Sequence, residues 1–100
     1  MAQLIYSAQA LNDLQRLVDF LAPTEPALAL ETVALIEEAV NLLQRHPLVG
    51  RPVEHGLREL VISRGRTGYL ALYDLVPAHD AVLILGVRHQ REAGYRSPEG

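Results

Sequence analysis

An imidazole, several guanidinium groups and a phenol follow the most apolar stretch of the chain. Residues 82–87 are Val-Leu-Ile-Leu-Gly-Val, and Arg88, His89, Arg91 and Tyr95 come directly after them. Histidine exchanges protons near neutral pH, arginine binds phosphate, and tyrosine stacks on bases or donates its hydroxyl. Metal-free RNA cleavage needs a base, an acid and cations that stabilise the charged phosphorane. If the protein cleaves RNA, these residue types predict His89, Arg91 and Tyr95 as the catalytic residues.

The same side chains are compatible with binding or structural roles. An imidazole at the end of a strand can stabilise the sheet through a hydrogen bond, so His89 can also have a structural role. A guanidinium group suits phosphates and carboxylates better than an ammonium does. Five arginines are candidates for contacting a target or a partner protein: Arg58, Arg64, Arg66, Arg88 and Arg91. Arg58 alternates with apolar residues, and we expect it either at a binding surface or half-buried and paired with Glu54 or Asp74.

Charge is distributed unevenly along the chain. Residues 1–50 hold two basic residues against six acidic ones, a net −4, and residues 51–100 hold seven against six, a net +1. All nine basic residues are arginine, which fits either an arginine-rich codon bias or a preference for phosphate and carboxylate ligands. A chain with a net charge of −3 is a poor general binder of nucleic acid, because counterion release needs a positive face. A local arginine surface in the second half is compatible with this balance.

Neither a metal site nor a membrane segment is expected. There is no cysteine, which excludes disulfides and thiolate ligands. His46, His55 and His79 fall in expected loops without a metal-ligand spacing, so we expect no metal and no cofactor. No apolar run approaches the roughly 20 residues of a membrane span, and the N-terminal residues do not resemble a signal peptide. We expect a cytoplasmic protein without membrane contact.

Two amphipathic helices are expected in the first half of the chain. Residues 4–6 form a short strand candidate, and Ser7 is a good N-cap for the helix that follows. This helix, about fourteen residues long, should end at Pro23, since apolar residues recur every three or four positions up to there. A second helix should begin at residues 24–26, with Thr24 as its cap, and stop near residues 46–47. Its apolar stripe is wide enough to serve the core or, in part, a partner.

Three strands are expected in the second half. They span residues 57–63, 68–76 and 82–89, separated by turn residues at 65–68 and by a hairpin loop at 77–80. Tyr69 and Tyr73 share one strand face and should pack against a helix. The predicted fold is a single α+β domain, residues 1–100, with an N-terminal strand and an antiparallel helical hairpin packed on a small, mainly antiparallel sheet.

Short motifs in this order resemble toxins of the RelE/ParE superfamily from bacterial type II toxin–antitoxin modules. Residues 10–14 match an early A-x-x-D-L helix, and Leu43 with residues 46–52 matches an L…P-x-x-G-R junction. Residues 57–60 resemble the arginine-bearing strand, residues 69–73 the Y-x-x-x-Y strand, and residues 82–91 the closing I-L-x-V-x-H-x-R strand. The resemblance covers nearly the whole chain.

The resemblance implies a growth inhibitor that a cognate antitoxin neutralises, with a toxin–antitoxin hetero-oligomer and a role in plasmid stabilisation. Residues 50–52 and the compact 87–91 end look more like ParE-type members, which inhibit DNA gyrase by binding. The alternative is a RelE-type endoribonuclease that cleaves mRNA on the ribosome, and a further alternative is a non-toxic binding module of the same fold. We expect the antitoxin to cover the sheet and its arginine-bearing end.

Overall fold

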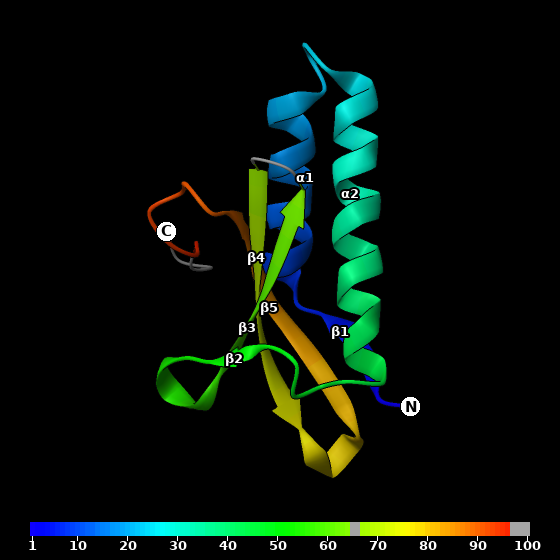
Figure 1. Cartoon of the computed structure of the whole chain (residues 1–100), viewed down its shortest axis with the longest axis vertical. Helices are drawn as coiled ribbons and strands as arrows, with labels where there is room; N and C mark the ends of the chain where they lie inside the picture. The colour runs from blue at the N-terminus through cyan, green and yellow to red at the C-terminus, as the bar shows by residue number, and fades with distance from the viewer. Residues whose placement is uncertain (65–66, 97–100) are drawn as a thin grey trace.

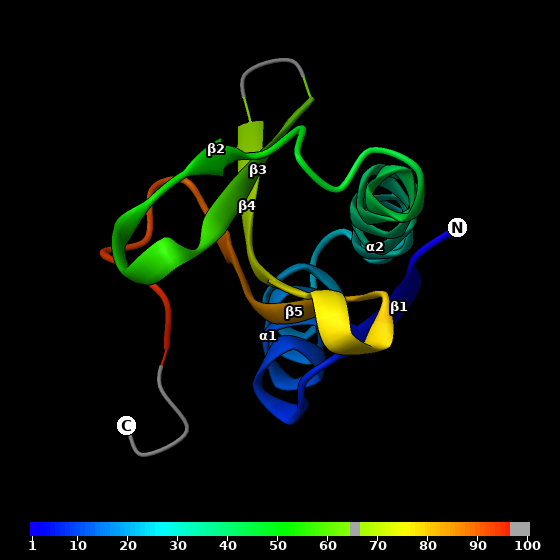
Figure 2. The same cartoon turned by 90° about the horizontal axis from the view of Figure 1, so that it is seen from below.

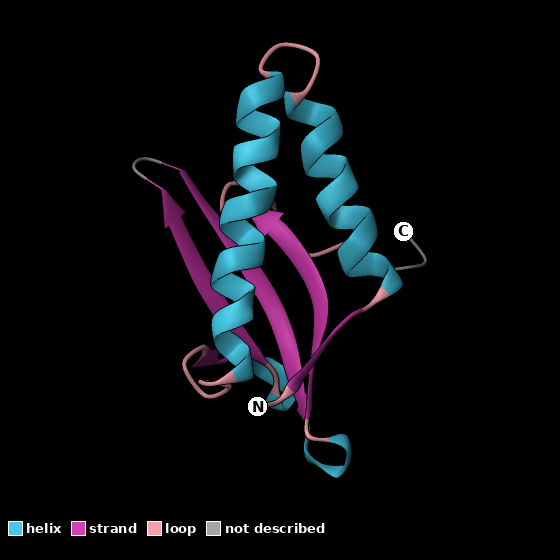
Figure 3. Cartoon of the chain, turned by 90° about the vertical axis from the view of Figure 1, so that its right-hand side faces the viewer, coloured by secondary structure: helices cyan, strands magenta, loops and turns pink. Residues whose placement is uncertain are grey.

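Two helices cover one face of a five-stranded sheet in the computed structural model, which describes residues 1–64 and 67–96 (Figures 1 and 3). The helices are α1 (Ala8–Leu21) and α2 (Pro26–Asn41). The strands are β1 (Gln3–Tyr6), β2 (Arg51–Pro52), β3 (Arg58–Arg64), β4 (Thr67–Val76) and β5 (Ala81–His89). The predicted α+β class, with a helical hairpin on one face of the sheet, is confirmed.

The two helices begin differently. As predicted, Ser7 caps α1, and its Oγ accepts a hydrogen bond of 3.0 Å from the N–H of Ala10. The prediction that Thr24 caps α2 is wrong: Glu25 holds the N-cap position and makes no side-chain cap hydrogen bond. Pro26, the first helical residue, has no N–H, so the start of α2 has one unpaired donor fewer. Beyond α2, residues Leu42–Gln44 continue as a turn of 3₁₀ helix, so helical structure ends two residues before His46.

The sheet has the strand order β1-β5-β4-β3-β2. β1 is parallel to β5, and the other neighbours are antiparallel, which agrees with the mainly antiparallel sheet predicted. β2 was not predicted, because two residues that include a proline carry no alternation. It pairs Arg51 with Glu59 and Pro52 with Arg58, and so joins the segment after α2 to the sheet.

The core lies between the helices and β3, β4 and β5. Its largest fully buried side chains include Ile36 of α2, Tyr73 of β4 and Ile84 of β5. Tyr69 and Tyr73 belong to this core together with helix residues, as the shared strand face predicted. No helix in the described part of the chain combines the length and apolar character that crossing a membrane requires.

Side chains of helix α1 form hydrogen bonds with the backbone of β5 beyond the point where its pairing with β1 ends. β1 ends opposite Ile84, so the last residues of β5 have no neighbouring strand on that side. Asp13, only 1% exposed, accepts a 2.9 Å hydrogen bond from the N–H of Val87. Arg16 donates to the carbonyl of Val87 at 3.3 Å and contacts Asp13 at 3.4 Å. Polar side chains of a helix therefore replace a strand here, and the edge is closed to further pairing.

Candidate functional site

His89 is the last residue of β5 and lies opposite Tyr69 of β4. Its ring meets the Tyr69 ring edge-on, with centroids 5.2 Å apart. Nδ1 accepts a 3.1 Å hydrogen bond from the N–H of Arg91, so in the neutral ring the proton sits on Nε2. The Arg91 side chain is exposed and makes no polar contact with any part of the chain that the structure describes. The structure thus brings these two candidates together.

Glu92 fastens the residues after β5 to α1. Its carboxylate accepts two hydrogen bonds from Arg16, at 2.8 and 2.7 Å, and a third from the N–H of His89 at 3.0 Å. Burial would raise the pKa of Glu92, but these donors outweigh burial and hold its pKa below the usual range. The carboxylate is therefore ionised near neutral pH and anchors the start of residues 90–96, which follow β5 and which we call the tail. Sequence analysis did not single out Glu92, because nothing near it in sequence marks Arg16 as its partner.

The tail then crosses the sheet face that points away from the helices (Figure 2). There Tyr95 donates a 2.7 Å hydrogen bond to Glu59 of β3, whose other oxygen is bound by Arg51 of β2. The Tyr95 ring packs on Gly86, where a Cβ would lie 3.1 Å from ring atom Cδ1. The same Cβ would lie 3.2 Å from the Asp13 carboxylate, so a side chain at position 86 would crowd both Tyr95 and Asp13.

These contacts suit Tyr95 for holding the tail and not for exchanging protons. Burial raises the pKa of its phenol well above the ordinary value, and the neighbouring Glu59 carboxylate raises it further. Burial alone would raise the pKa of Glu59, but the hydrogen bonds from Tyr95 and Arg51 bring it below the usual range. At neutral pH Glu59 is an ion and Tyr95 its neutral donor.

Arg88 is also engaged internally. Its guanidinium lies over the Tyr95 ring, 5.0 Å from the centroid, and Nη1 donates a 2.6 Å hydrogen bond to the carbonyl of Glu92. The side chain is half-buried. Cation–π stacking on a partly desolvated ring holds the guanidinium in place, so Arg88 stabilises the tail. Its predicted role in contacting a partner stays a prediction.

Arg58 lies at the opposite end of β3 from Arg64, six residues away, which is roughly 20 Å along a strand. Its guanidinium donates to the carbonyls of Leu48 and Gly50, at 3.1 and 2.7 Å. Half-burial was predicted correctly, but the predicted pairing with Glu54 or Asp74 is wrong: within the described residues, Arg58 forms no ion pair. Loop carbonyls take the place of an acid.

Two of the five predicted arginines have no described side chain. Arg64 closes β3 opposite Thr67, and Arg66 falls outside the described residues. The described members of the set therefore divide into Arg58 at one end of β3, and Arg88 and Arg91 near the other end of the sheet. They do not form one continuous surface.

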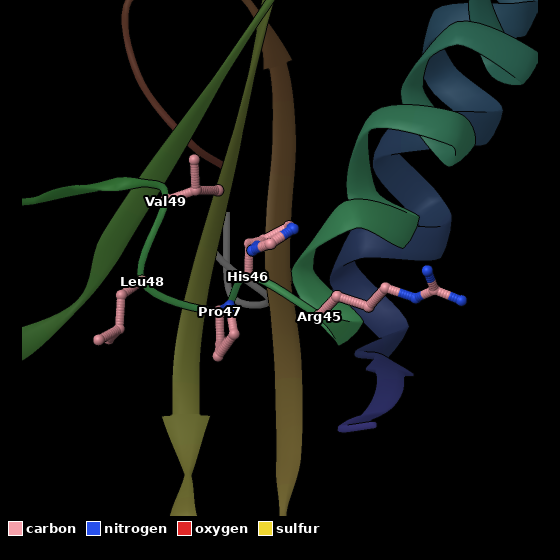
Figure 4. A pocket seen from close by; sticks show the side chains of 5 residues that line it. All are labelled: Arg45, His46, Pro47, Leu48 and Val49. Carbon is pink, nitrogen blue, oxygen red and sulfur yellow. The ribbon is translucent and has the colours of Figure 1, made fainter.

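A second candidate surface lies between α2 and β2, at residues 45–49, which we call the junction loop (Figure 4). Its backbone is held from the core side. The buried hydroxyl of Tyr73 donates to the carbonyl of Pro47 at 2.7 Å and accepts from the N–H of Gly50 at 2.9 Å. The two Arg58 bonds described above fix the same stretch. A Cβ on Gly50 would lie 2.5 Å from the Tyr73 hydroxyl, so only glycine fits.

The junction loop exposes apolar side chains. Leu48 is 62% exposed and Val49 59% exposed, and in Figure 4 the Leu48 side chain points away from α2. The loop lines a shallow, open hollow of about 420 Å³. Sequence analysis missed this surface, although the two aliphatic residues inside the P-x-x-G-R motif were an available signal.

No group of three or more histidine or acidic side chains in residues 1–64 and 67–96 could hold a metal ion.

Comparison with known proteins gives consistent similarities. A family model described as the ParE toxin of the type II toxin–antitoxin system parDE matches residues 4–94. The chain is 34% identical over 84 residues to Toxin RelE3 of Caulobacter vibrioides, which covers 84% of this chain and 89% of that protein.

Two solved structures are similar over most of the fold. One, described as the chromosomal ParDE system from P. aeruginosa, aligns with a TM-score of 0.73 and 27% identity, over 89% of this chain and 96% of that chain. The other, the toxin–antitoxin complex RelBE2 from Mycobacterium tuberculosis, aligns with a TM-score of 0.61 and 29% identity, over 91% and 93%.

Proposed function

The chain belongs to the ParE toxin family of type II toxin–antitoxin systems, and on that premise we propose that it inhibits bacterial growth by binding DNA gyrase. The family match agrees with the resemblance found in the sequence motifs. We propose in addition a non-enzymatic mode of action, a cytoplasmic location and a role in plasmid stabilisation.

The main support for binding gyrase, and not cleaving RNA, is that the tail side chains already make internal contacts. RNA cleavage would need a proton donor, a proton acceptor and cations free to meet phosphate. Tyr95 is bound to Glu59, and Arg88 is bound to a tail carbonyl and stacked on Tyr95. Using either group on a substrate would require undoing contacts that hold the tail on the sheet.

Gyrase as target is supported by the ParE family model and by the charge of the chain. A net charge of −3 without lysine is unfavourable for entering a ribosome, whose RNA phosphates repel an acidic protein. A target that is itself a protein places no such demand on overall charge.

Induction of the protein without antitoxin tests this function. We expect a DNA-damage response in cells, and inhibition of supercoiling when the purified toxin is added to purified gyrase. Unchanged supercoiling at micromolar toxin, together with cleaved mRNA in the induced cells, would refute the proposal. Normal growth on induction would instead identify a non-toxic binding module.

The second candidate function is ribosome-dependent RNA cleavage, and the geometry of His89 favours it. Nδ1 accepts from the N–H of Arg91, so the neutral ring has an Nε2–H that can donate a hydrogen bond to a phosphate oxygen. The exposed Arg91 side chain is available for phosphate. If this function holds, His89→Ala abolishes codon-phased cuts in translated mRNA, whereas a gyrase inhibitor keeps its effect on supercoiling in the same variant.

A cognate antitoxin is the constitutive partner in this proposal. The two solved relatives are described as toxin–antitoxin systems or complexes, and both cover most of this chain. We therefore expect the protein to be held in an inactive hetero-oligomer until the antitoxin is lost.

A further inference from the structure

We propose that the junction loop, residues 45–49, is the surface on which the antitoxin docks, through a segment that is both acidic and apolar. The inference rests on the proposed function for the existence of an antitoxin. It locates the contact at the end of α2 and away from the arginine-bearing tail.

The loop is rigid before any partner arrives. Two side chains hydrogen-bond to the backbone of the loop and of Gly50, the residue after it. Tyr73 bonds to Pro47 and Gly50, and Arg58 bonds to Leu48 and Gly50. Within the loop, the N–H of Val49 donates to the carbonyl of His46 at 3.1 Å. A surface already fixed in one conformation loses little entropy on binding, which favours affinity.

Leu48 and Val49 on this backbone lie outside the buried core. Leu48 and Val49 remain about 60% exposed, and Leu42, whose carbonyl accepts from the N–H of His46 at 2.9 Å, is 57% exposed. Neighbouring apolar side chains held in solvent are typical of an interaction site and promote aggregation if left bare. A partner that is bound constitutively explains them better than a target met only transiently.

Charge selects the kind of partner. Residues 39–53 contain two arginines and no acidic residue, in a chain whose net charge is −3. Arg45 extends beside α2, at the other end of the loop from Leu48 (Figure 4), and Arg51 follows on β2. Arg51 pairs with Glu59 but keeps 61% of its side chain exposed. A segment that covers the apolar residues therefore meets an arginine at each end, which suits carboxylates in the partner.

The tail is a weaker candidate for this contact. Arg88 and Tyr95 already bind one another and Glu59, so the groups expected to attract the antitoxin are occupied. Arg91 is exposed there, but none of the large exposed apolar side chains in the described part of the chain belongs to residues 88–96.

The test measures affinity between the purified toxin and the antitoxin encoded by the small reading frame beside its gene. We expect Leu48→Ser and Val49→Ser each to weaken binding about tenfold, and the double variant about a hundredfold. Leu30→Ser is the matched control, because Leu30 on α2 is 74% exposed and lies far from the loop in sequence. It should leave affinity unchanged. Circular dichroism should show all variants folded, since none of these side chains is buried.

A pair of charge reversals separates the loop from the tail. Arg45→Glu should slow association about tenfold at low salt, and Arg91→Glu should not. Unchanged affinity in the Leu48/Val49 double variant, or a larger loss from Arg91→Glu than from Arg45→Glu, would overturn the docking site. Loss of gyrase inhibition with intact antitoxin affinity in the double variant would also overturn it and would assign the loop to the target.

Separate measurements test the proposed function and the proposed docking site. Affinity for the antitoxin is measured without reference to toxicity, so a wild-type protein that does not inhibit gyrase refutes the target alone. The loop variants would still report whether the docking surface is correct.

Discussion

Tyr73→Phe removes one oxygen atom from the centre of the protein and should release a loop at its surface. Tyr73 is fully buried, and its hydroxyl joins the carbonyl of Pro47 to the N–H of Gly50. Burial raises the pKa of this phenol, with the Gly50 N–H and the Arg58 charge acting in the opposite direction. The phenol is therefore protonated at neutral pH and able to donate.

The expected cost follows from the two hydrogen bonds. Each is worth about 1 kcal/mol net, and the N–H of Gly50, bonded in a buried position, is left without its partner. We expect a loss of about 2–3 kcal/mol of unfolding free energy, or roughly 10–20 °C in Tm for a domain of this size. The ring itself stays, so no large cavity forms.

Urea denaturation of both proteins measures the difference, and amide exchange at Gly50 locates it. Tyr69→Phe is the control, because Tyr69 is also buried on β4 and its hydroxyl makes no hydrogen bond to the described residues. It should cost less than about 0.5 kcal/mol. Equal losses in the two variants, or unchanged exchange at Gly50 in Tyr73→Phe, would show that the hydroxyl does not hold the loop.

Three other substitutions test the contacts around the sheet. Gly50→Ala should cost about 1–3 kcal/mol in thermal unfolding, because its Cβ would lie 2.5 Å from the Tyr73 hydroxyl; a stability equal to wild type would show that the loop can shift. Asp13→Ala should cost about 2–3 kcal/mol in urea, since it leaves the N–H of Val87 unpaired in a buried site, and a loss under 0.5 kcal/mol would mean that water replaces the carboxylate. Glu59 has a folded pKa below its unfolded value of about 4.3, so its ionised form stabilises the fold above that pH and the contribution is lost as pH falls through the folded pKa. Glu59→Gln should flatten this acid dependence of stability, and an identical pH profile would contradict the assignment.

Regular patterns made the main elements predictable. The three-to-four spacing of α1 and the cap at Ser7 are local signals, and they fixed that helix correctly. Alternation along β4 placed Tyr73 on the core face for the same reason. These features depend on residues close together in the chain, where spacing alone decides which face is buried.

The contacts that shape the candidate surfaces join residues far apart in the chain, so no local spacing pattern in the sequence predicts them. Tyr95 and Glu59 are 36 residues apart, and both are polar, so neither hydropathy nor spacing links them. Alternation indicated that Arg58 is half-buried, but its partners are loop carbonyls, and every residue type carries a carbonyl. The hydrogen-bond partner of a buried arginine depends on where the chain folds back, which one sequence does not reveal.

In the junction loop, the residues that hold the backbone differ from the residues that are exposed to solvent. This separation affects how the sequence of the protein can change during evolution. Tyr73, Arg58 and Gly50 hold the backbone in place through buried and half-buried contacts, while the side chains at positions 48 and 49 are largely exposed. Substitution there alters which surface is displayed without weakening the molecule that displays it. If the junction loop docks the antitoxin as proposed, duplicated copies of such a gene can diverge in partner choice while sharing one scaffold, and mismatched toxin–antitoxin pairs would fail to bind before either protein became unstable.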